Sequence, residues 1–272
     1  MKPLHLALAG ATAIAAVTAG ATAYAHHAWN DYHWRRTGAQ LTMPIGDNVS
    51  AAWDAHLQKA ITDWNQSSVI QATAAGGVTN PKNCKPISGR IEVCSSAYGN
   101  NGWLGIAQIW LSNGHITQGV TKLNDSYFKP GSRYNTAAWR AAVTCQEIGH
   151  DFGLGHQDED FSTDATTSCM EYTNVPEGNG QPDSHDMAEL NDIYGHSDGT
   201  AFTTITAASP GRAPSEEAGG NTPGEWGRVV SHDAQGRHDV FVQELGNGRV
   251  KITHVLYTLE ARRHVHEDGH DH

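Results

Sequence analysis

The sequence is short of basic charge and carries no basic cluster. Lysine and arginine together number 18, against 29 aspartate and glutamate residues, and the formal net charge is −11. The chain therefore lacks the positive footprint that binding to phosphate groups requires. We expect no nucleic-acid partner.

Long apolar runs are also missing beyond the first 25 residues. No later segment approaches the roughly 18 to 20 apolar residues that a membrane helix needs. The opening stretch, MKPLHLALAGATAIAAVTAGATAYA, has one lysine, an Ala-rich apolar middle and Ala23-Tyr24-Ala25 at its end. This pattern is typical of a secretory signal peptide cleaved after Ala25. We expect a secreted protein, extracellular or periplasmic, with no membrane span.

Cysteine is scarce, with four residues whose spacing matches no zinc–cysteine pattern. An even count in an exported chain indicates two disulfides, for which three pairings are possible. Cys84 and Cys94 flank a short turn that contains proline and glycine, so we expect a local bridge between them. That pairing leaves Cys145 with Cys169.

The hydrophobic pattern predicts alternating strands and helices over the first two thirds of the chain. LTMPIGDNVSAAWDAHLQKAITDWNQSS (41–68) predicts a strand followed by an amphipathic helix. SVIQATAA (68–75) and GRIEVCSSAYG (89–99) have strand character. NGWLGIAQIWLSNGHITQGVTKLN (101–124) predicts a hairpin. Helices are predicted in TAAWRAAVTCQEIGHDFGL (136–154) and HDMAELNDIYG (185–195).

The last third of the chain changes in composition. Residues 199–224 are rich in Gly, Pro, Ser, Thr and Ala, as linkers are. EWGRVVSH, HDVFVQEL and RVKITHVLYTLE then alternate like three short strands. We predict a signal peptide (1–25), a main mixed α/β domain (26–198), a linker (199–224), a small antiparallel β appendage (225–260) and a disordered His-rich tail (261–272).

The stretch TCQEIGHDFGLGHQDE (144–159) carries the parts of a metal site. On a helix, Gln146 and His150 are four residues apart and share one face, with Glu147 beside them. Gly153 permits a sharp turn, after which His156 can return as a third ligand. Zinc catalysis needs three protein ligands, an open position and a carboxylate base. We predict Gln146, His150 and His156 as ligands and Glu147 as the base.

A histidine at position 146 would complete the signature H-E-x-x-H-x-x-G-x-x-H, so the chain resembles the metzincin zinc metalloproteases of the matrixin, astacin and serralysin type. SCMEYT (168–173) resembles their Met-turn, which implies that Met170 lies beneath the metal. Tyr172 then matches a tyrosine that stabilises the oxyanion in astacin- and serralysin-like members. The implied fold is α/β (α+β), with a twisted mixed sheet and an active-site helix.

The resemblance extends to the strands before that helix. GWLGIAQIW (102–110) resembles the substrate-binding edge strand of the family, and GHITQGVTKLN (114–124) the strand that follows it. A protein or peptide substrate is expected to add to this edge as an extra strand. The implied contact residues are Gly105, Ile106, Ala107, Gln108 and Ile109.

Gln146 leaves three alternatives, because zinc prefers nitrogen or sulfur to an amide oxygen. Gln146 binds the metal through its side-chain oxygen, another group such as Asp158, Glu159 or a water replaces it, or the site is inactive. His185 is the further candidate if Gln146 is a bystander. The expected function is that of a monomeric, secreted zinc-dependent endopeptidase, with a metal-activated water and Glu147 as general base. The alternative is a metzincin-like binding protein with little or no activity.

Overall fold

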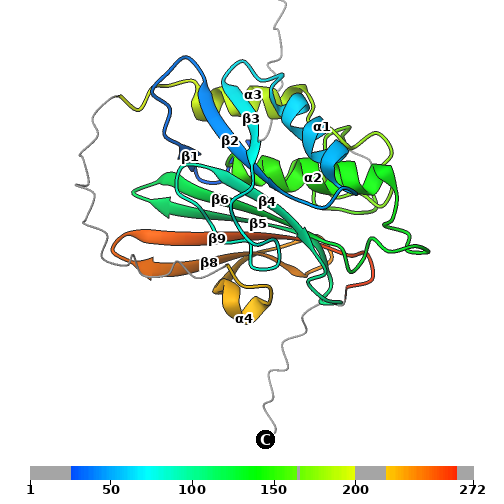
Figure 1. Cartoon of the computed structure of the whole chain (residues 1–272). Helices are drawn as coiled ribbons and strands as arrows, with labels where there is room; N and C mark the ends of the chain where they lie inside the picture. The colour runs from blue at the N-terminus through cyan, green and yellow to red at the C-terminus, as the bar shows by residue number, and fades with distance from the viewer. Residues whose placement is uncertain (1–25, 164–165, 200–218, 262–272) are drawn as a thin grey trace, which may run out of the picture.

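The computed structural model describes residues 26–163, 166–199 and 219–261. The predicted signal peptide, most of the predicted linker and nearly all of the predicted tail lie outside the described residues. Within them the protein is a mixed α/β structure built on a nine-stranded sheet. Figure 1 shows three helices on one side of this sheet and a short fourth helix on the other.

The strands and helices predicted before residue 198 are present. The strands are β2 (Leu41–Asn48), β3 (Ile70–Gly76), β4 (Ile91–Ser96), β5 (Trp103–Ser112) and β6 (His115–Asn124), and the helices are α1 (Asp54–Trp64), α2 (Ala137–Asp151) and α3 (Ser184–Tyr194). The sequence reading missed two short elements, β1 (His33–Trp34) and α4 (Pro223–Trp226). Both are too short to show a periodic pattern.

The last three strands are β7 (Arg228–His232), β8 (His238–Gly246) and β9 (Arg249–Tyr257). The sheet order is β3-β2-β4-β6-β5-β9-β8-β7, and β1 pairs with β6. The three C-terminal strands therefore continue the main sheet, and the prediction of a separate appendage over 225–260 was wrong. An open strand edge offers unpaired backbone groups, and β9 satisfies those of β5 by antiparallel pairing.

The end of the predicted linker is also part of the packed structure. The buried ammonium of Lys122 donates hydrogen bonds to the carbonyl of Gly219 and to the side chain of Asn221. Trp226 on α4 is buried against Phe241 and Trp103 in a second, smaller core. The segment from residue 219 to α4 is thus held against one face of the sheet, the face that carries α4 (Figure 1).

The main core lies between the sheet and helices α1 and α2. It includes Trp53, Trp64 and Ile148 from the helices and Ile45 and Leu104 from the strands. Helix α2 begins at a capped N-terminus, where the Thr136 side chain accepts a hydrogen bond from the Trp139 N–H. The second half of this helix is buried throughout, so its polar residues are enclosed in the interior.

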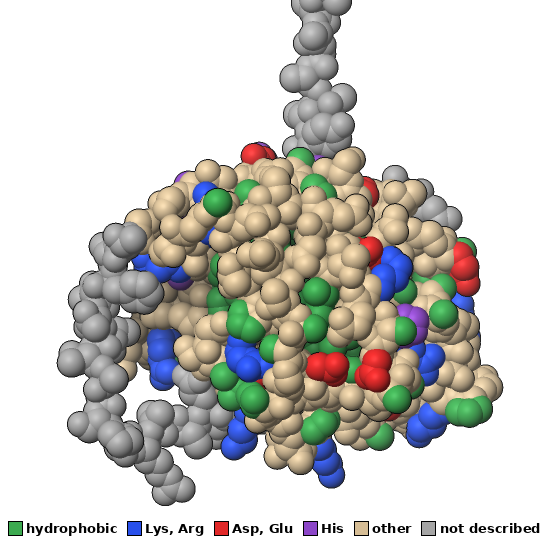
Figure 2. Space-filling model, turned by 45° about the horizontal axis from the view of Figure 1, so that its top comes forward, with side chains coloured by type: hydrophobic (Ala, Val, Ile, Leu, Met, Phe, Trp, Pro, Cys, Tyr) green, Lys and Arg blue, Asp and Glu red, His purple; other side chains and the backbone are tan. Residues whose placement is uncertain are grey.

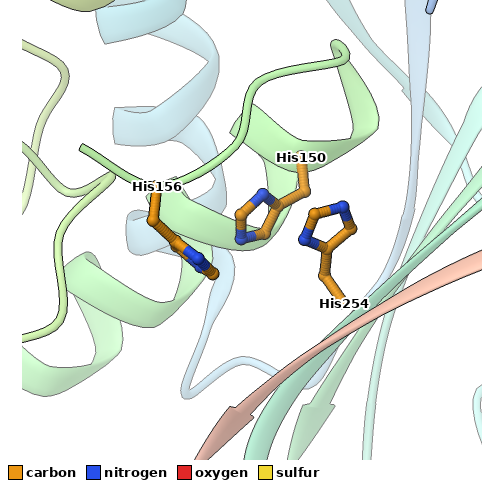
Figure 3. Close-up of side chains that lie close together, drawn as sticks. All are labelled: His150, His156 and His254. Atoms are coloured by element: carbon orange, nitrogen blue, oxygen red, sulfur yellow. The ribbon is translucent and has the colours of Figure 1, made fainter. Parts of the chain in front are cut away.

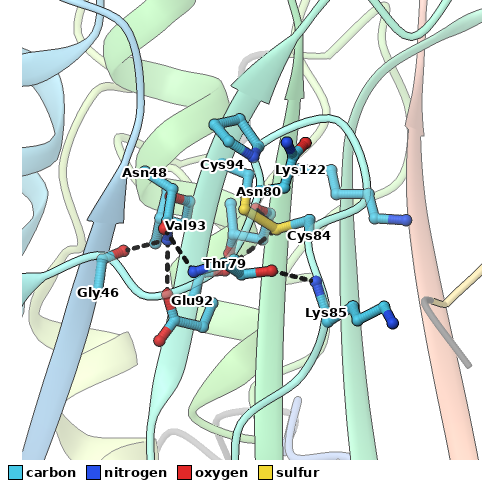
Figure 4. Close-up of a disulfide and its surroundings, with 12 residues drawn as sticks. Gly46, Asn48, Thr79, Asn80, Cys84, Lys85, Glu92, Val93, Cys94 and Lys122 are labelled. Atoms are coloured by element: carbon cyan, nitrogen blue, oxygen red, sulfur yellow. Dashed lines mark hydrogen bonds between the residues drawn. A yellow bond between two sulfur atoms is a disulfide. The ribbon is translucent and has the colours of Figure 1, made fainter. Parts of the chain in front are cut away.

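Both predicted disulfides are present, Cys84–Cys94 and Cys145–Cys169. The first lies at β4 beside a polar network in which Asn48 donates to the Glu92 carboxylate at 2.6 Å (Figure 4). The second joins α2 to the segment before Met170. Among the described residues, no helix is long and apolar enough to cross a membrane.

The surface mixes residue types. On the face in Figure 2, hydrophobic, basic and acidic side chains are scattered among polar ones. Isolated hydrophobic residues of this kind are usual on protein surfaces. The residues that could carry chemistry lie inside the protein, between α2 and the sheet.

Candidate metal centre

The first histidine of the centre lies near the C-terminal end of α2. His150 is 2% exposed, and its Nδ1–H donates to the carbonyl of Leu154 at 2.8 Å. This hydrogen bond leaves the Nε2 lone pair free for a metal, the arrangement that orients histidine ligands in metal sites. Gly153, at a φ of 97°, makes the turn that brings Leu154 back to the ring. A Cβ there would lie 2.1 Å from the carbonyl oxygen of Tyr32, so only glycine fits.

The second histidine follows that turn. The ring of His156 lies perpendicular to that of His150, with 4.6 Å between the centroids. Its Nδ1–H donates to a carboxylate oxygen of Glu159 at 3.2 Å, so its Nε2 also remains available. The structure therefore has the predicted turn at Gly153, which brings His156 back to His150.

The third histidine comes from β9. His254 pairs with Ala107 of β5, and its ring stacks on that of His150 with centroids 4.1 Å apart. Figure 3 shows the three rings converging from the helix, the following loop and the strand. One nitrogen from each of His150, His156 and His254 lies within 4.8 Å of the other two. The three residues, here called the three-histidine centre, could hold a metal ion.

The electrostatics of the three-histidine centre suit a cation. Burial lowers the pKa of His150 and His254 well below the usual value, and the ring of His156 adds to the effect on both. Burial and nearby His27 lower the pKa of His156 to about 3. The rings are therefore neutral near pH 7, the form that binds a metal. In the described part of the chain, Nδ1 of His254 is buried without a hydrogen-bond partner.

Gln146, the predicted first ligand, makes a hydrogen bond through its amide nitrogen. It is buried, and its side-chain N–H donates to the carbonyl of Glu171 at 3.1 Å. Its Oε1 finds no hydrogen-bond partner among the described residues. The helix contributes one of the three imidazoles and β9 another, His254; the assignment of Gln146 as a ligand stays a prediction.

The other groups considered as replacements do not join the three-histidine centre. The carboxylate of Asp158 is hydrogen-bonded to the Thr163 hydroxyl. Glu159 contacts His156, and with His156 and Asp239 it forms a neighbouring group that could itself hold a metal ion. His185 lies instead in a group with His27 and Glu189.

Glu147, the predicted base, is fully buried, and neither of its carboxyl oxygens has a hydrogen-bond partner among the described residues. Burial, and then the carboxyl of Asp151, raise the pKa of Glu147 well above its usual value. The carboxyl lies directly against Gly105 of β5, where an added Cβ would come within 2.4 Å of Oε1. Gly105 is two residues from Ala107, the partner of His254.

Tyr172 and Met170 line the same region. The ring of Tyr172 lies 4.3 Å from that of His156, and its hydroxyl donates to Asp239 at 3.2 Å. Burial, with help from Glu159 and Asp233, raises the pKa of Asp239 to about 7. Met170 is buried against Gly149, whose added Cβ would lie 2.4 Å from the Met170 sulfur. The assignment of residues 168–173 as a Met-turn stays a prediction.

The predicted substrate edge is not an edge. Gly105, Ile106, Ala107, Gln108 and Ile109 all pair with β6 on one side and β9 on the other. The Gln108 side chain donates to the Thr253 hydroxyl at 3.1 Å, and Ile106 packs in the core on the α4 side. No backbone group of these five residues is left for a peptide on the sheet, so the edge-strand prediction was wrong.

Sequence reasoning missed His254 and Trp29. The ring of Trp29 packs edge-on against that of His254, with centroids 4.6 Å apart. The backbone N–H of Trp29 donates to the carbonyl of Gly153. The sequence did contain a signal for His254. Ile252, His254 and Leu256 are two residues apart on one strand and so share a face, and Ile252 and Leu256 belong to the main core. A histidine in the inward position of an otherwise apolar strand face is a candidate ligand.

Comparisons with known proteins add little to this description. No protein-family model matches the sequence. No curated protein matches it either. Among solved structures, one match is high choriolytic enzyme 1, a hatching enzyme zinc-protease from the medaka fish Oryzias latipes. The TM-score is 0.32 and the identity 13%, over 61% of this chain and 95% of that chain.

Proposed function

We propose that this chain is a zinc-dependent peptidase whose metal is held by His150, His156 and His254. The observation that carries the proposal is the convergence of three buried, neutral imidazoles within 4.8 Å, in the same interior region as the unpartnered Glu147 carboxyl. Three imidazole nitrogens with an open fourth position form a typical catalytic zinc site. When bound, the ion supplies Lewis acidity toward the carbonyl of a peptide bond.

The chain's own residues supply the proton transfers. Glu147 is the general base that takes a proton from the attacking water and passes it to the leaving amine. A cation in the centre offsets the burial that raises the pKa of Glu147, because a nearby opposite charge favours the ionised carboxylate. Tyr172 is the hydroxyl donor beside His156, and Asp239 holds its hydroxyl in place until substrate arrives.

Substrate has to approach by a route other than the edge of β5. A cavity of about 500 Å³ is lined by Phe161 together with Arg133, Asn174 and Arg237. Phe161 stacks on Tyr172 with centroids 4.7 Å apart, and Tyr172 in turn lies against His156. We propose this cavity as the entry side, with the Phe161–Tyr172 pair moving when a peptide binds.

A second candidate function is metal binding without catalysis. The pairing of β9 with β5 and the burial of all three histidine side chains favour it. Both limit the access of a peptide or protein substrate to the three-histidine centre. In that case the ion stabilises the fold by joining α2 to β9.

Zinc stoichiometry and a cleavage assay on the full chain separate the two functions. A denatured protein serves as substrate, and fragments are detected by mass spectrometry before and after chelation and zinc readdition. Cleavage that is lost on chelation and restored by zinc supports the peptidase. One zinc lost in His254→Ala, without cleavage by the wild type, supports the binding protein, and zinc content unchanged by His254→Ala contradicts both.

A further inference from the structure

A second cluster of histidines lies where the N-terminal segment meets the end of α3. Oδ1 of Asp198 lies 3.2 Å from Nε2 of each of three histidines, His33, His115 and His196. Nε2 of His33 and Nε2 of His196 are also 3.2 Å apart. One ligand atom from each of His33, His196 and Asp198 lies within 4.8 Å of the other two, so these three could hold a metal ion. Together with His115, which contacts the same carboxylate oxygen, they are called the Asp198 cluster.

Hydrogen bonds alone account poorly for this convergence. One carboxylate oxygen has two lone pairs, and three imidazole nitrogens approach it at equal distance. Zinc–nitrogen and zinc–oxygen bonds of 2.0–2.1 Å in a tetrahedron place neighbouring ligand atoms about 3.3 Å apart. The 3.2 Å separations among Nε2 of His33, Nε2 of His196 and Oδ1 of Asp198 match the three edges of one face of such a tetrahedron.

Three members of the cluster, His33, His115 and Asp198, are anchored on their far sides as the ligands of metal sites are. Nδ1 of His33 donates to the carbonyl of Asp31 at 2.6 Å, and Nδ1 of His115 to that of Asn113 at 3.3 Å. Oδ2 of Asp198 accepts the backbone N–H of Arg36 at 2.6 Å. These contacts direct both Nε2 atoms and Oδ1 toward the centre, which is how outer partners orient metal ligands.

Burial of the Asp198 cluster is graded from inside to outside. The Asp198 side chain is 6% exposed and that of His33 12%, whereas His196 is 53% exposed. An ion can therefore arrive from solvent on the His196 side and be enclosed on the other. We propose that the Asp198 cluster binds one zinc ion, separate from the three-histidine centre, through Nε2 of His33, Nε2 of His196 and Oδ1 of Asp198.

This zinc joins β1 to the segment after α3, and the Asp198 side chain also contacts His115 at the start of β6. A metal that ties distant segments together stabilises the folded chain. His33 and His115 are register partners in the sheet, and Asp198 donates its N–H to the carbonyl of Arg36. The zinc fixes β1, and through it the segment whose Trp29 packs on His254.

Zinc content of the full chain tests the proposal. Each protein is saturated with zinc, desalted and analysed by metal mass spectrometry. Only differences from wild type are counted, so that any zinc on the histidine-rich C-terminus cancels. His196→Ala and Asp198→Asn should each lose one zinc per chain. His232→Ala, which removes an exposed histidine of β7, should lose none. His254→Ala should lose one zinc while the Asp198 cluster keeps its own.

Thermal unfolding with and without zinc is the second measurement. Zinc should raise the Tm of the wild type by more than that of His196→Ala, whose exposed side chain can be removed without leaving a core cavity. Unchanged zinc content and an unchanged zinc-induced shift in both His196→Ala and Asp198→Asn would overturn the proposal. That outcome would leave the peptidase proposal standing, because the latter depends on the zinc lost in His254→Ala.

Discussion

The imidazole of His254 stacks on that of His150, with centroids 4.1 Å apart and planes inclined by 17°. One ring belongs to the helix that carries the metal-binding motif, and the other to the last strand of the sheet. Pairing of β9 with β5 brings them together. The C-terminal strands are therefore part of the candidate metal centre, and the following predictions depend on this relationship.

Glu147→Gln should abolish peptidase activity and leave zinc content unchanged, because it removes the base and no proposed ligand. The expected loss in kcat is about 10²- to 10⁴-fold, the usual contribution of a general base. Glu244→Gln, an exposed glutamate on β8, is the matched control. Activity equal to wild type in Glu147→Gln would remove Glu147 from the mechanism.

Gly105→Ala should displace Glu147 without removing a metal ligand. The new methyl group would lie 2.4 Å from the Glu147 carboxyl and 2.8 Å from Val143, so the side chains must shift, at a cost of about 1–3 kcal/mol. Activity should fall at least tenfold while zinc content stays the same. Gly76→Ala, a strand glycine with nothing near its Cβ position, should behave like wild type, and equal behaviour of both variants would contradict the proposed contact.

Loss of the Cys145–Cys169 disulfide should affect both stability and zinc affinity. The bridge closes a loop with a sequence separation of 24, and its removal by paired serine substitution should cost about 3 kcal/mol of unfolding free energy. It also joins α2 to the segment that carries Met170. Removing Cys84–Cys94 should lower stability but leave zinc affinity intact. Zinc affinity that falls equally in both double variants would show that the effect is not local.

The metal-free protein should lose stability at acid pH through His254. Burial holds the pKa of folded His254 well below the usual 6.5, so the unfolded chain takes up the proton first as pH falls. The variant His254→Gln has no titratable side chain at this position, so it takes up no proton there in either state. Relative to the variant, wild type should lose up to about 1.4 kcal/mol per pH unit below pH ~6.5, until the folded pKa is reached. Urea unfolding in chelator from pH ~7 to ~5 measures this difference, and a difference independent of pH would refute it.

The sequence was sufficient for the local part of the site. The four-residue spacing of Gln146 and His150 and the turn at Gly153 are properties of one helix and its exit, and the structure has both. The alternating pattern also predicted each of the strands β7, β8 and β9. These inferences succeed because side-chain periodicity depends on neighbouring residues alone.

The partner of β5 could not be predicted in the same way. Periodicity shows that β9 has an apolar face, but nothing local shows which strand edge it joins. The edge of β5 is equally suited to a substrate peptide and to β9, because both would use the same backbone hydrogen bonds. The pairing of β9 with β5 places His254 at the centre as a third imidazole, which no local pattern predicts.

Zinc affinity of two single variants tests the three-histidine centre most directly. Competition with a chromogenic chelator is measured for wild type, His254→Ala and Gln146→Ala, in the Asp198→Asn background so that a second zinc does not interfere. His254→Ala should weaken binding by at least 10- to 100-fold, the scale on which even outer-shell partners act, whereas Gln146→Ala should remain within a few-fold of wild type. Full affinity in His254→Ala together with a large loss in Gln146→Ala would contradict the assignment of His254 as the third ligand.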